Sequence, residues 1–211
     1  ARLLLDKGYE VVGIVRSCTT SSLSNLQYLH IESKVKIVRS DLGNLVAVIN
    51  LIKEYQPNEV YNLSAQSSVS ASFKDPIGAI TYNTISVLNL LEAIKLVDNR
   101  VKFYQASSSD MFGNIDDLPI TINTQMKPIS PYAVSKASSH WSVVCYRESY
   151  SLFAVSGILF NHESKLRTNN FFIKKVISDS VDISLGIKDV LYVGNINIKR
   201  DFGYAPKYVE A

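Results

Sequence analysis

The sequence has little of several features that would define its class at once. Its 211 residues include only two cysteines, one tryptophan and two methionines. Cys18 and Cys145 lie far apart and lack metal-ligand spacing, so we exclude a disulfide-rich secreted domain and expect both thiols to stay reduced. The longest uncharged apolar runs fall well short of the roughly 20 residues that a membrane span needs, and no signal-peptide pattern opens the sequence. We therefore expect a cytoplasmic protein that does not insert into membranes.

An excess of one charge is also missing, because 22 basic side chains are balanced by 19 acidic ones. The lysines and arginines are scattered along the sequence, so it shows no electrostatic footprint for nucleic acid. We expect a small-molecule partner instead. At roughly 150 residues per domain, the length suits one domain, or one domain and part of another.

Short β-branched runs alternate with longer segments of helical spacing, which predicts a parallel sheet covered by crossover helices. The sequence predicts strands at Glu10–Val15, Val35–Val38, Glu59–Leu63, Val101–Ala106 and Ala154–Phe160. It predicts helices at Asn44–Tyr55, Ile77–Val97 and Pro131–Tyr150, with Ser130 as the N-cap of the last one. Right-handed crossovers then give an α/β fold with a doubly wound, Rossmann-like parallel sheet.

One signature of a doubly wound nucleotide-binding domain is missing. Such a domain carries a Gly-rich turn after its first strand, where the amides at a helix N-terminus meet a pyrophosphate. Ala1–Lys7 is typical of the end of a helix stopped by Gly8, and the sequence contains no G-x-G-x-x-G. We therefore expect a fragment or a truncated gene product, with Tyr208–Ala211 as the first turns of a further helix.

Tyr132 and Lys136 are four residues apart at the start of a predicted helix, so their side chains project from one face. A nearby ammonium stabilises a phenolate, which brings a tyrosine pKa from about 10 toward neutrality and allows general-base catalysis. The same spacing also occurs by chance on helix surfaces. The preceding predicted strand ends in Ser107–Asp110, where hydroxyls and a carboxylate could bind a substrate oxygen, or form a Ser-rich turn capped by the aspartate.

Arg16 follows the strand Glu10–Val15, where an acidic residue would select NAD through a ribose 2′-hydroxyl and an arginine accepts a 2′-phosphate. The arginine favours NADP; the alternative is a solvent-facing side chain at a strand end. Asp41–Leu42 and Leu63–Ser67 place small and polar groups at two further strand ends. Both segments are simply loops if no cofactor binds.

Four separated segments together resemble the extended short-chain dehydrogenase/reductase family. Phe103–Gly113 and Ser130–Lys136 match patterns that this superfamily shares. Gly157–Ser164 and Lys199–Gly203, followed by Tyr208–Ala211, are similar in particular to the GDP-mannose 4,6-dehydratases. The resemblance implies a lyase with bound NADP that converts GDP-D-mannose to GDP-4-keto-6-deoxy-D-mannose, and a homodimer or homotetramer. It also implies that residues 1–160 form part of an NADP-binding domain and that residues 161–211 begin the substrate-binding region.

The resemblance implies a role for each matching residue. Tyr132 is the base for the C4 hydroxyl, and Lys136 lowers its pKa and holds the nicotinamide ribose. Ser108 stands at the position of a threonine that bonds the same oxygen, and Asp110 at that of the glutamate that removes the C5 proton. The implied cofactor contacts are Arg16, Ser17, Cys18, Thr19, Asp41, Leu42, Leu63, Ser64, Ala65, Gln66, Ser67, Tyr132, Lys136, His162 and Arg167.

Contacts to the GDP-sugar are implied at Asn161, Phe172, Lys175 and Arg200. The two cations also suit a diphosphate on physical grounds, and without a nucleotide they are surface charges. No second histidine follows His162 at helical spacing, so the sequence predicts no zinc site.

This sequence departs from the family pattern at several positions. Asp110 is one methylene shorter than glutamate, which withdraws the carboxylate by roughly 1 Å, and such a displacement can cost about a hundredfold in rate. Ser17 replaces an arginine, while Lys165–Thr168 and Phe202 replace other family residues. Because the Gly-rich turn is missing, we expect this polypeptide alone to bind NADP poorly and to aggregate. The alternatives are a non-catalytic remnant and a related nucleotide-sugar reductase or epimerase.

Overall fold

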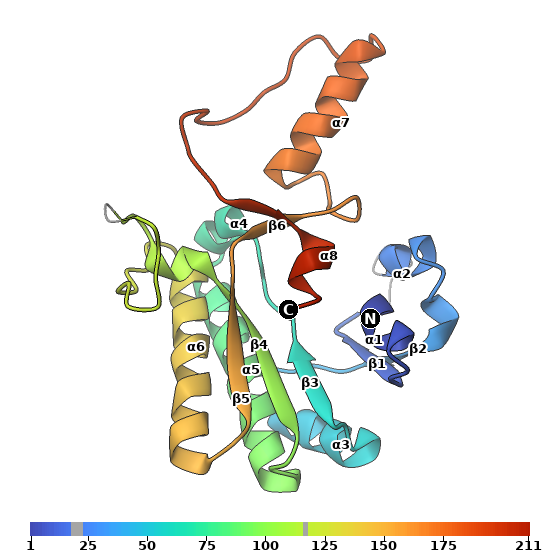
Figure 1. Ribbon diagram of the computed structural model, residues 1–211, viewed down its shortest axis with the longest axis vertical. Helices are drawn as coiled ribbons and strands as arrows, with labels where there is room; N and C mark the ends of the chain where they lie inside the picture. The colour runs from blue at the N-terminus through green and yellow to red at the C-terminus, as the bar shows by residue number, and fades with distance from the viewer. Residues whose placement is uncertain (18–22, 116–117) are drawn as a thin grey trace. The chain divides into compact units, whose positions relative to one another are not determined.

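The computed structural model describes residues 1–17, 23–115 and 118–211 of the chain (Figure 1). Cys18 and Thr19, two of the predicted cofactor contacts, lie outside the described residues. The chain forms two compact units, Leu3–Leu159 and Phe160–Ala211.

The first unit alternates strands and helices, as the sequence predicts. Its elements are α1 (Arg2–Asp6), β1 (Val11–Val15), α2 (Ser24–Tyr28), η2 (Glu32–Lys34), β2 (Val35–Arg39), α3 (Leu45–Tyr55), β3 (Glu59–Asn62), α4 (Val69–Lys74), α5 (Pro76–Val97), β4 (Lys102–Ser108), η3 (Ser109–Phe112), α6 (Pro131–Tyr150) and β5 (Ala154–Leu159). Each of the five predicted strands and three predicted helices is confirmed, with ends shifted by at most two residues. The strands pair in parallel, which confirms the α/β class.

The parallel strands form two separate pieces of sheet instead of one. β1 pairs with β2, and β3, β4 and β5 pair in that order. A doubly wound sheet places its first strand between two such pieces. No element of the described residues occupies that position, so the pieces are not hydrogen-bonded to each other.

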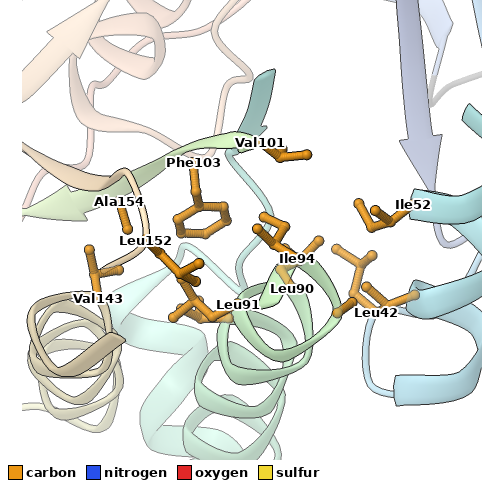
Figure 2. Close-up of a cluster of buried hydrophobic side chains, with 13 residues drawn as sticks. Leu42, Ile52, Leu90, Leu91, Ile94, Val101, Phe103, Val143, Leu152 and Ala154 are labelled. Carbon is orange, nitrogen blue, oxygen red and sulfur yellow. The ribbon is translucent and has the colours of Figure 1, made fainter. Parts of the chain in front are cut away.

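The hydrophobic core of the first unit lies between the helices and the three-stranded piece (Figure 2). Phe103 of β4, Leu91 and Ile94 of α5, Val143 of α6 and Ala154 of β5 are each at most 1% exposed. Burying a large apolar side chain stabilises the fold by roughly 1.5–3 kcal/mol. The core therefore packs α5 and α6 against the sheet. This packing also fixes the position of the first turns of α6.

Helix α5 is, among the described residues, the one helix long and apolar enough to cross a membrane. It packs against α3 and α6 within the first unit, and 44% of its most apolar window is buried there. Its buried residues include the polar Asn83 and Ser86 as well as apolar side chains. The helix thus carries polar groups into the interior.

The second unit contains β6 (Asn161–Glu163), α7 (Phe172–Ser184), β7 (Phe202–Tyr204) and α8 (Ala205–Tyr208). β6 pairs in parallel with β7, with Asn161 opposite Phe202 and Glu163 opposite Tyr204. This pairing brings two motif segments side by side that lie some forty residues apart in sequence. The expectation that a helix starts at Tyr208 is wrong, because α8 begins at Ala205 and Val209 is its C-cap.

Candidate active site

The predicted catalytic pair lies in the first two turns of α6. Ser130 caps this helix by accepting a hydrogen bond from the Ala133 amide at 3.1 Å, which confirms the predicted N-cap. Tyr132 and Lys136 are 8% and 4% exposed, respectively. The Lys136 Nζ atom is 5.8 Å from the centroid of the Tyr132 ring. The spacing of four residues therefore brings a phenol and an amine together inside the first unit, as predicted.

Lys136 is held in the interior by one backbone acceptor. Its Nζ donates a hydrogen bond of 2.7 Å to the Ala106 carbonyl oxygen in β4. Burial lowers the pKa of Lys136 from its ordinary value of 10.5 to about 8, because desolvation penalises the ammonium form. The amine still carries a proton at neutral pH, but it releases that proton more readily than a solvated lysine.

The Ala106 carbonyl oxygen is itself fixed by a buried amide chain. Gln105 Nε2 donates to the same oxygen at 3.0 Å, and Asn62 Nδ2 of β3 donates to Gln105 Oε1 at 2.8 Å. Asn62 and Gln105 are at most 3% exposed. Buried polar groups that are fully hydrogen-bonded define a single geometry, so β3 and β4 position the acceptor of Lys136.

At the end of β4, Ser108 caps the short helix η3, and Asp110 of that helix is exposed. The Ser108 hydroxyl is buried and accepts a hydrogen bond from the Asp110 amide at 3.2 Å. Ser108 thus caps η3, a role that the turn interpretation gave to the aspartate. The Asp110 carboxylate is exposed and, within the described part of the chain, has no hydrogen-bond or ion-pair partner. It is available for a substrate.

A network of hydrogen bonds to the Tyr132 backbone was not predicted from the sequence. The Tyr132 amide donates to Ser72 Oγ at 3.2 Å, and its carbonyl oxygen accepts from Ser135 Oγ at 2.7 Å. Asn83 Nδ2 donates to Ser135 Oγ at 2.9 Å, and Asn83 Oδ1 accepts from the Gln66 amide at 2.8 Å. The network therefore links α6, α4 and α5 to the predicted cofactor segment Leu63–Ser67. The sequence feature that could have indicated this network is Asn83, a polar residue in the middle of the long apolar helix α5.

The predicted cofactor segment Leu63–Ser67 follows β3. Ser64 is tied back to Asn62 Oδ1 through its amide at 3.1 Å and its hydroxyl at 2.6 Å. Leu63 is 70% exposed, although it follows a buried residue. Gln66 Nε2 donates to the Ser68 carbonyl oxygen at 3.1 Å, while Gln66 Oε1 is buried and has no hydrogen-bond partner among the residues that the structure describes. An orphaned buried acceptor beside an exposed loop fits a site where a bound polar molecule completes the contacts.

The other predicted cofactor residues of the first unit follow β1 and β2. Asp41 lines a hollow of about 600 Å³ that Tyr82 of α5 also lines, and its Oδ1 accepts from the Gly43 amide at 2.9 Å. The exposed Arg16 guanidinium lies over the Tyr82 ring, 5.2 Å from its centroid. Leu42 differs from the others, because its side chain lies in the hydrophobic core. Ser17 directly follows Arg16 and precedes residues 18–22, which the structure does not describe.

In the second unit, the predicted cofactor residues His162 and Arg167 are both engaged by neighbours. His162 Nδ1 donates to the Phe160 carbonyl oxygen at 2.9 Å, which leaves Nε2 as the acceptor. Arg167 Nε is 3.5 Å from Glu163 Oε2, and its guanidinium stacks 3.4 Å from the centroid of the Phe171 ring. Both side chains are therefore held in defined orientations within their own unit.

The predicted substrate residues are more exposed. Phe172 begins α7 and is 54% exposed, and the Arg200 guanidinium donates to the neighbouring Lys199 carbonyl oxygen at 3.2 Å. Lys175 Nζ donates to Asp179 Oδ2 at 2.5 Å and to the Tyr192 carbonyl oxygen at 2.7 Å. Asn161 is half-buried at the start of β6. Cationic side chains on an exposed surface suit an anionic ligand.

Comparison with known proteins identifies the family. A family model described as GDP-mannose 4,6 dehydratase matches residues 1–211. The chain belongs to the GDP-mannose 4,6-dehydratase family. The Tyr132–Lys136 pair and the paired segments of β6 and β7 thus lie in a chain that matches this family throughout its length.

Two curated relatives and one solved structure illustrate the similarity. The GDP-mannose 4,6 dehydratase of Cricetulus griseus is 42% identical over 100% of this chain and 59% of its own length. That of Yersinia enterocolitica is 39% identical over 99% of this chain and 58% of its own length. The crystal structure of Thermus thermophilus UDP-glucose 4-epimerase in complex with NAD is 25% identical, with a TM-score of 0.83 over 99% of this chain and 67% of that one. The chain therefore spans under two thirds of the length of the curated dehydratases it matches.

Proposed function

We propose that this chain is part of a GDP-mannose 4,6-dehydratase with bound NADP, which converts GDP-D-mannose to GDP-4-keto-6-deoxy-D-mannose. One observation carries the proposal. A buried lysine, held by the Ala106 carbonyl oxygen at 2.7 Å, lies 5.8 Å from the ring of a buried tyrosine in a chain of the dehydratase family. We further propose a cytoplasmic homodimer or homotetramer that acts in GDP-fucose biosynthesis.

Tyr132 and Lys136 suit the first proton transfer. The Tyr132 phenolate would accept the proton of the substrate's C4 hydroxyl, and the Lys136 ammonium would stabilise that phenolate. The Ser108 hydroxyl would donate a hydrogen bond to the same C4 oxygen. When bound, a nicotinamide dinucleotide supplies reversible hydride acceptance.

Asp110 suits the elimination. Its exposed carboxylate would remove the proton at C5, while the C6 hydroxyl leaves, so that one molecule of water is lost across C5 and C6. The carboxylate has no competing partner among the described residues, which supports this role. The nucleotide diphosphate would be neutralised by the exposed Arg200 and by Lys175, whose side chain is 38% exposed and would exchange part of its contact with Asp179 for the phosphate.

The residues around the strand ends fit a nicotinamide dinucleotide. Gln66 Oε1 offers a buried acceptor that has no partner among the described residues, and the hollow lined by Asp41 and Tyr82 offers room near the end of β2. The epimerase of similar fold is a complex with NAD. Arg16 in place of an acidic residue supports the phosphorylated form, NADP.

The direct test is product formation by the complete gene product that carries this chain. Incubation with GDP-mannose and NADP should give a nucleotide sugar lighter by one water molecule, detected by mass spectrometry, with a 4-keto group trapped by borohydride reduction. The Tyr132→Phe variant is the control. Absence of such a product in the presence of NADP rejects the dehydratase.

A second candidate keeps the Tyr132–Lys136 chemistry without elimination, as in a nucleotide-sugar reductase or epimerase. The short side chain of Asp110 favours it, because the carboxylate is withdrawn by roughly 1 Å relative to a glutamate. Lengthening this side chain discriminates between the candidates. A dehydratase should gain rate from Asp110→Glu, whereas an epimerase should be indifferent.

A further inference from the structure

The carboxyl ends of β1 and β2 place two arginines next to each other. Val15, the last residue of β1, is in register with Arg39, the last residue of β2. Arg39 Nε donates to the Arg16 carbonyl oxygen at 3.3 Å, so the Arg39 side chain reaches across to the end of β1. Both side chains are exposed.

Neither arginine forms an ion pair with a carboxylate in the part of the chain that the structure describes, residues 1–17, 23–115 and 118–211. The nearest acid in sequence is Asp41, and one of its oxygens is occupied by the Gly43 amide at 2.9 Å. Two such guanidinium groups on adjacent strand ends attract an anion with several oxygens.

Tyr82 gives Arg16 a defined position. The Arg16 guanidinium lies 5.2 Å from the centroid of the Tyr82 ring, within the range of a cation–π interaction. Tyr82 and Asp41 also line the same hollow of about 600 Å³. One arginine is thus anchored on a wall of the hollow through Tyr82, and the other lies two residues before Asp41, which forms another part of that wall.

From this arrangement we infer that Arg39 is a specificity-determining residue that binds the 2′-phosphate of NADP together with Arg16, and that Tyr82 positions Arg16 for this contact. The inference rests on the proposed dinucleotide site and adds to it a second cation. The ligand class is a ribose 2′-phosphomonoester. An unphosphorylated dinucleotide has no group that needs Arg39.

The test uses 2′,5′-ADP and 5′-AMP as probes, which differ only in the 2′-phosphate. Binding of each to the complete gene product is measured by isothermal titration calorimetry. The unmodified protein should prefer 2′,5′-ADP. Arg39→Gln should lower the affinity for 2′,5′-ADP by about 10- to 100-fold, as expected for the loss of a charge-assisted hydrogen bond, and should leave the affinity for 5′-AMP unchanged.

Two further variants isolate the causes. Tyr82→Leu should weaken 2′,5′-ADP binding by roughly two- to fivefold through loss of the cation–π contact, while Tyr82→Phe should preserve it. Lys36→Gln is the matched charge control, because Lys36 is on the same strand and its ammonium lies over Tyr55, 4.7 Å from the ring centroid. This control should leave both affinities unchanged.

The outcomes separate this inference from the proposed function. Equal losses for both probes in Arg39→Gln, no loss for either, or an unmodified protein that does not prefer 2′,5′-ADP would overturn the role of Arg39. Such a protein could still dehydrate GDP-mannose. A protein that prefers 2′,5′-ADP and loses this preference in Arg39→Gln, yet makes no 4-keto product, supports the inference and contradicts the dehydratase.

Discussion

Lys136 and Lys175 both stand at positions implied for the reaction site, yet their surroundings are opposite. Lys136 is 4% exposed and its amine has one backbone acceptor, the Ala106 carbonyl oxygen. The Lys175 side chain is 38% exposed and forms an ion pair with Asp179. Burial lowers the pKa of Lys136 to about 8, whereas the neighbouring ammonium groups of Lys175 and Lys188 lower the pKa of Asp179.

The difference shows how one side-chain type serves two purposes. A desolvated amine whose pKa is near the working pH can hold or release a proton in a reaction. A partly exposed ammonium such as that of Lys175, paired with Asp179, keeps its charge and can also contact an anion. On the proposed function, Lys136 in the first unit would take part in proton transfer, and Lys175 in the second unit would contact an anion.

Removal of the phenol should have the largest effect. Tyr132→Phe should lower kcat for dehydration of GDP-mannose by about a thousandfold, because the base for the C4 hydroxyl is lost. Tyr61→Phe is the matched control, since Tyr61 is exposed on β3 and its hydroxyl donates to Glu59 at 2.7 Å. A loss of less than tenfold in Tyr132→Phe would show that another group is the base.

Replacing Lys136 or Lys175 by methionine tests directly whether the two lysines have different roles. Lys136→Met should lower kcat by about a hundredfold and move the pH–rate profile to higher pH, because the phenolate loses its ammonium. Lys175→Met should raise KM for GDP-mannose by about tenfold with little change in kcat, as expected for a charge-assisted contact to the nucleotide. Steady-state kinetics of the two variants should be measured side by side. Equal losses of kcat would contradict different roles for Lys136 and Lys175.

Lengthening Asp110 to glutamate tests whether its exposed carboxylate carries out the elimination. Asp110→Glu should raise the rate of elimination by up to about a hundredfold, since it restores roughly 1 Å of reach. Asp189→Glu, which lengthens another exposed acid outside the motif segments, should change nothing. Exchange of the C5 proton with deuterated water isolates this step, and an unchanged exchange rate in Asp110→Glu would favour the epimerase or reductase.

Loss of the hydrogen-bond network that reaches the Tyr132 backbone should destabilise the first unit. Asn83→Ala should lower the free energy of unfolding by about 1–3 kcal/mol, because Gln66 and Ser135 lose buried hydrogen-bond partners. Asn195→Ala should cost less than about 0.5 kcal/mol, since Asn195 is exposed and accepts one local hydrogen bond from Asn197. Urea unfolding followed by circular dichroism compares the two, and equal costs would contradict the importance of the network.

The buried amine also predicts how stability depends on pH. The pKa of Lys136 is about 8 in the folded protein and 10.5 when solvated, so the unfolded chain binds more protons between these values. Stability should therefore rise with pH in this window, by on the order of 2 kcal/mol between pH 7 and 9.5. Lys136→Met should lack this rise when urea midpoints are compared at both pH values. A parallel pH dependence in the two proteins would show that Lys136 is solvated.

Much of the first unit could be predicted from local signals in the sequence. Ser130 and Pro131 mark the start of α6, and the four-residue spacing places Tyr132 and Lys136 on one face. The strand runs identified β1 to β5, but periodicity does not specify which strand pairs with which. The split of the sheet into two pieces therefore required the structure.

The remaining features depend on contacts between distant residues. Asn83 and Gln66 are 17 residues apart, and Lys136 and Ala106 are 30 apart, so no local pattern indicates their hydrogen bonds. The strands β6 and β7 have three residues each, too few to show alternation. The adjacency of Arg16 and Arg39 likewise depends on strand register.

Titration of Lys136 by NMR tests the central claim most directly. The complete gene product labelled with ¹³C at lysine Cε gives one resonance for this residue, assigned by its loss in Lys136→Met. The midpoint of its titration should lie near pH 8, and the ordinary lysine value of 10.5 serves as the reference. A Lys136 midpoint equal to the reference value would contradict a buried amine beside Tyr132.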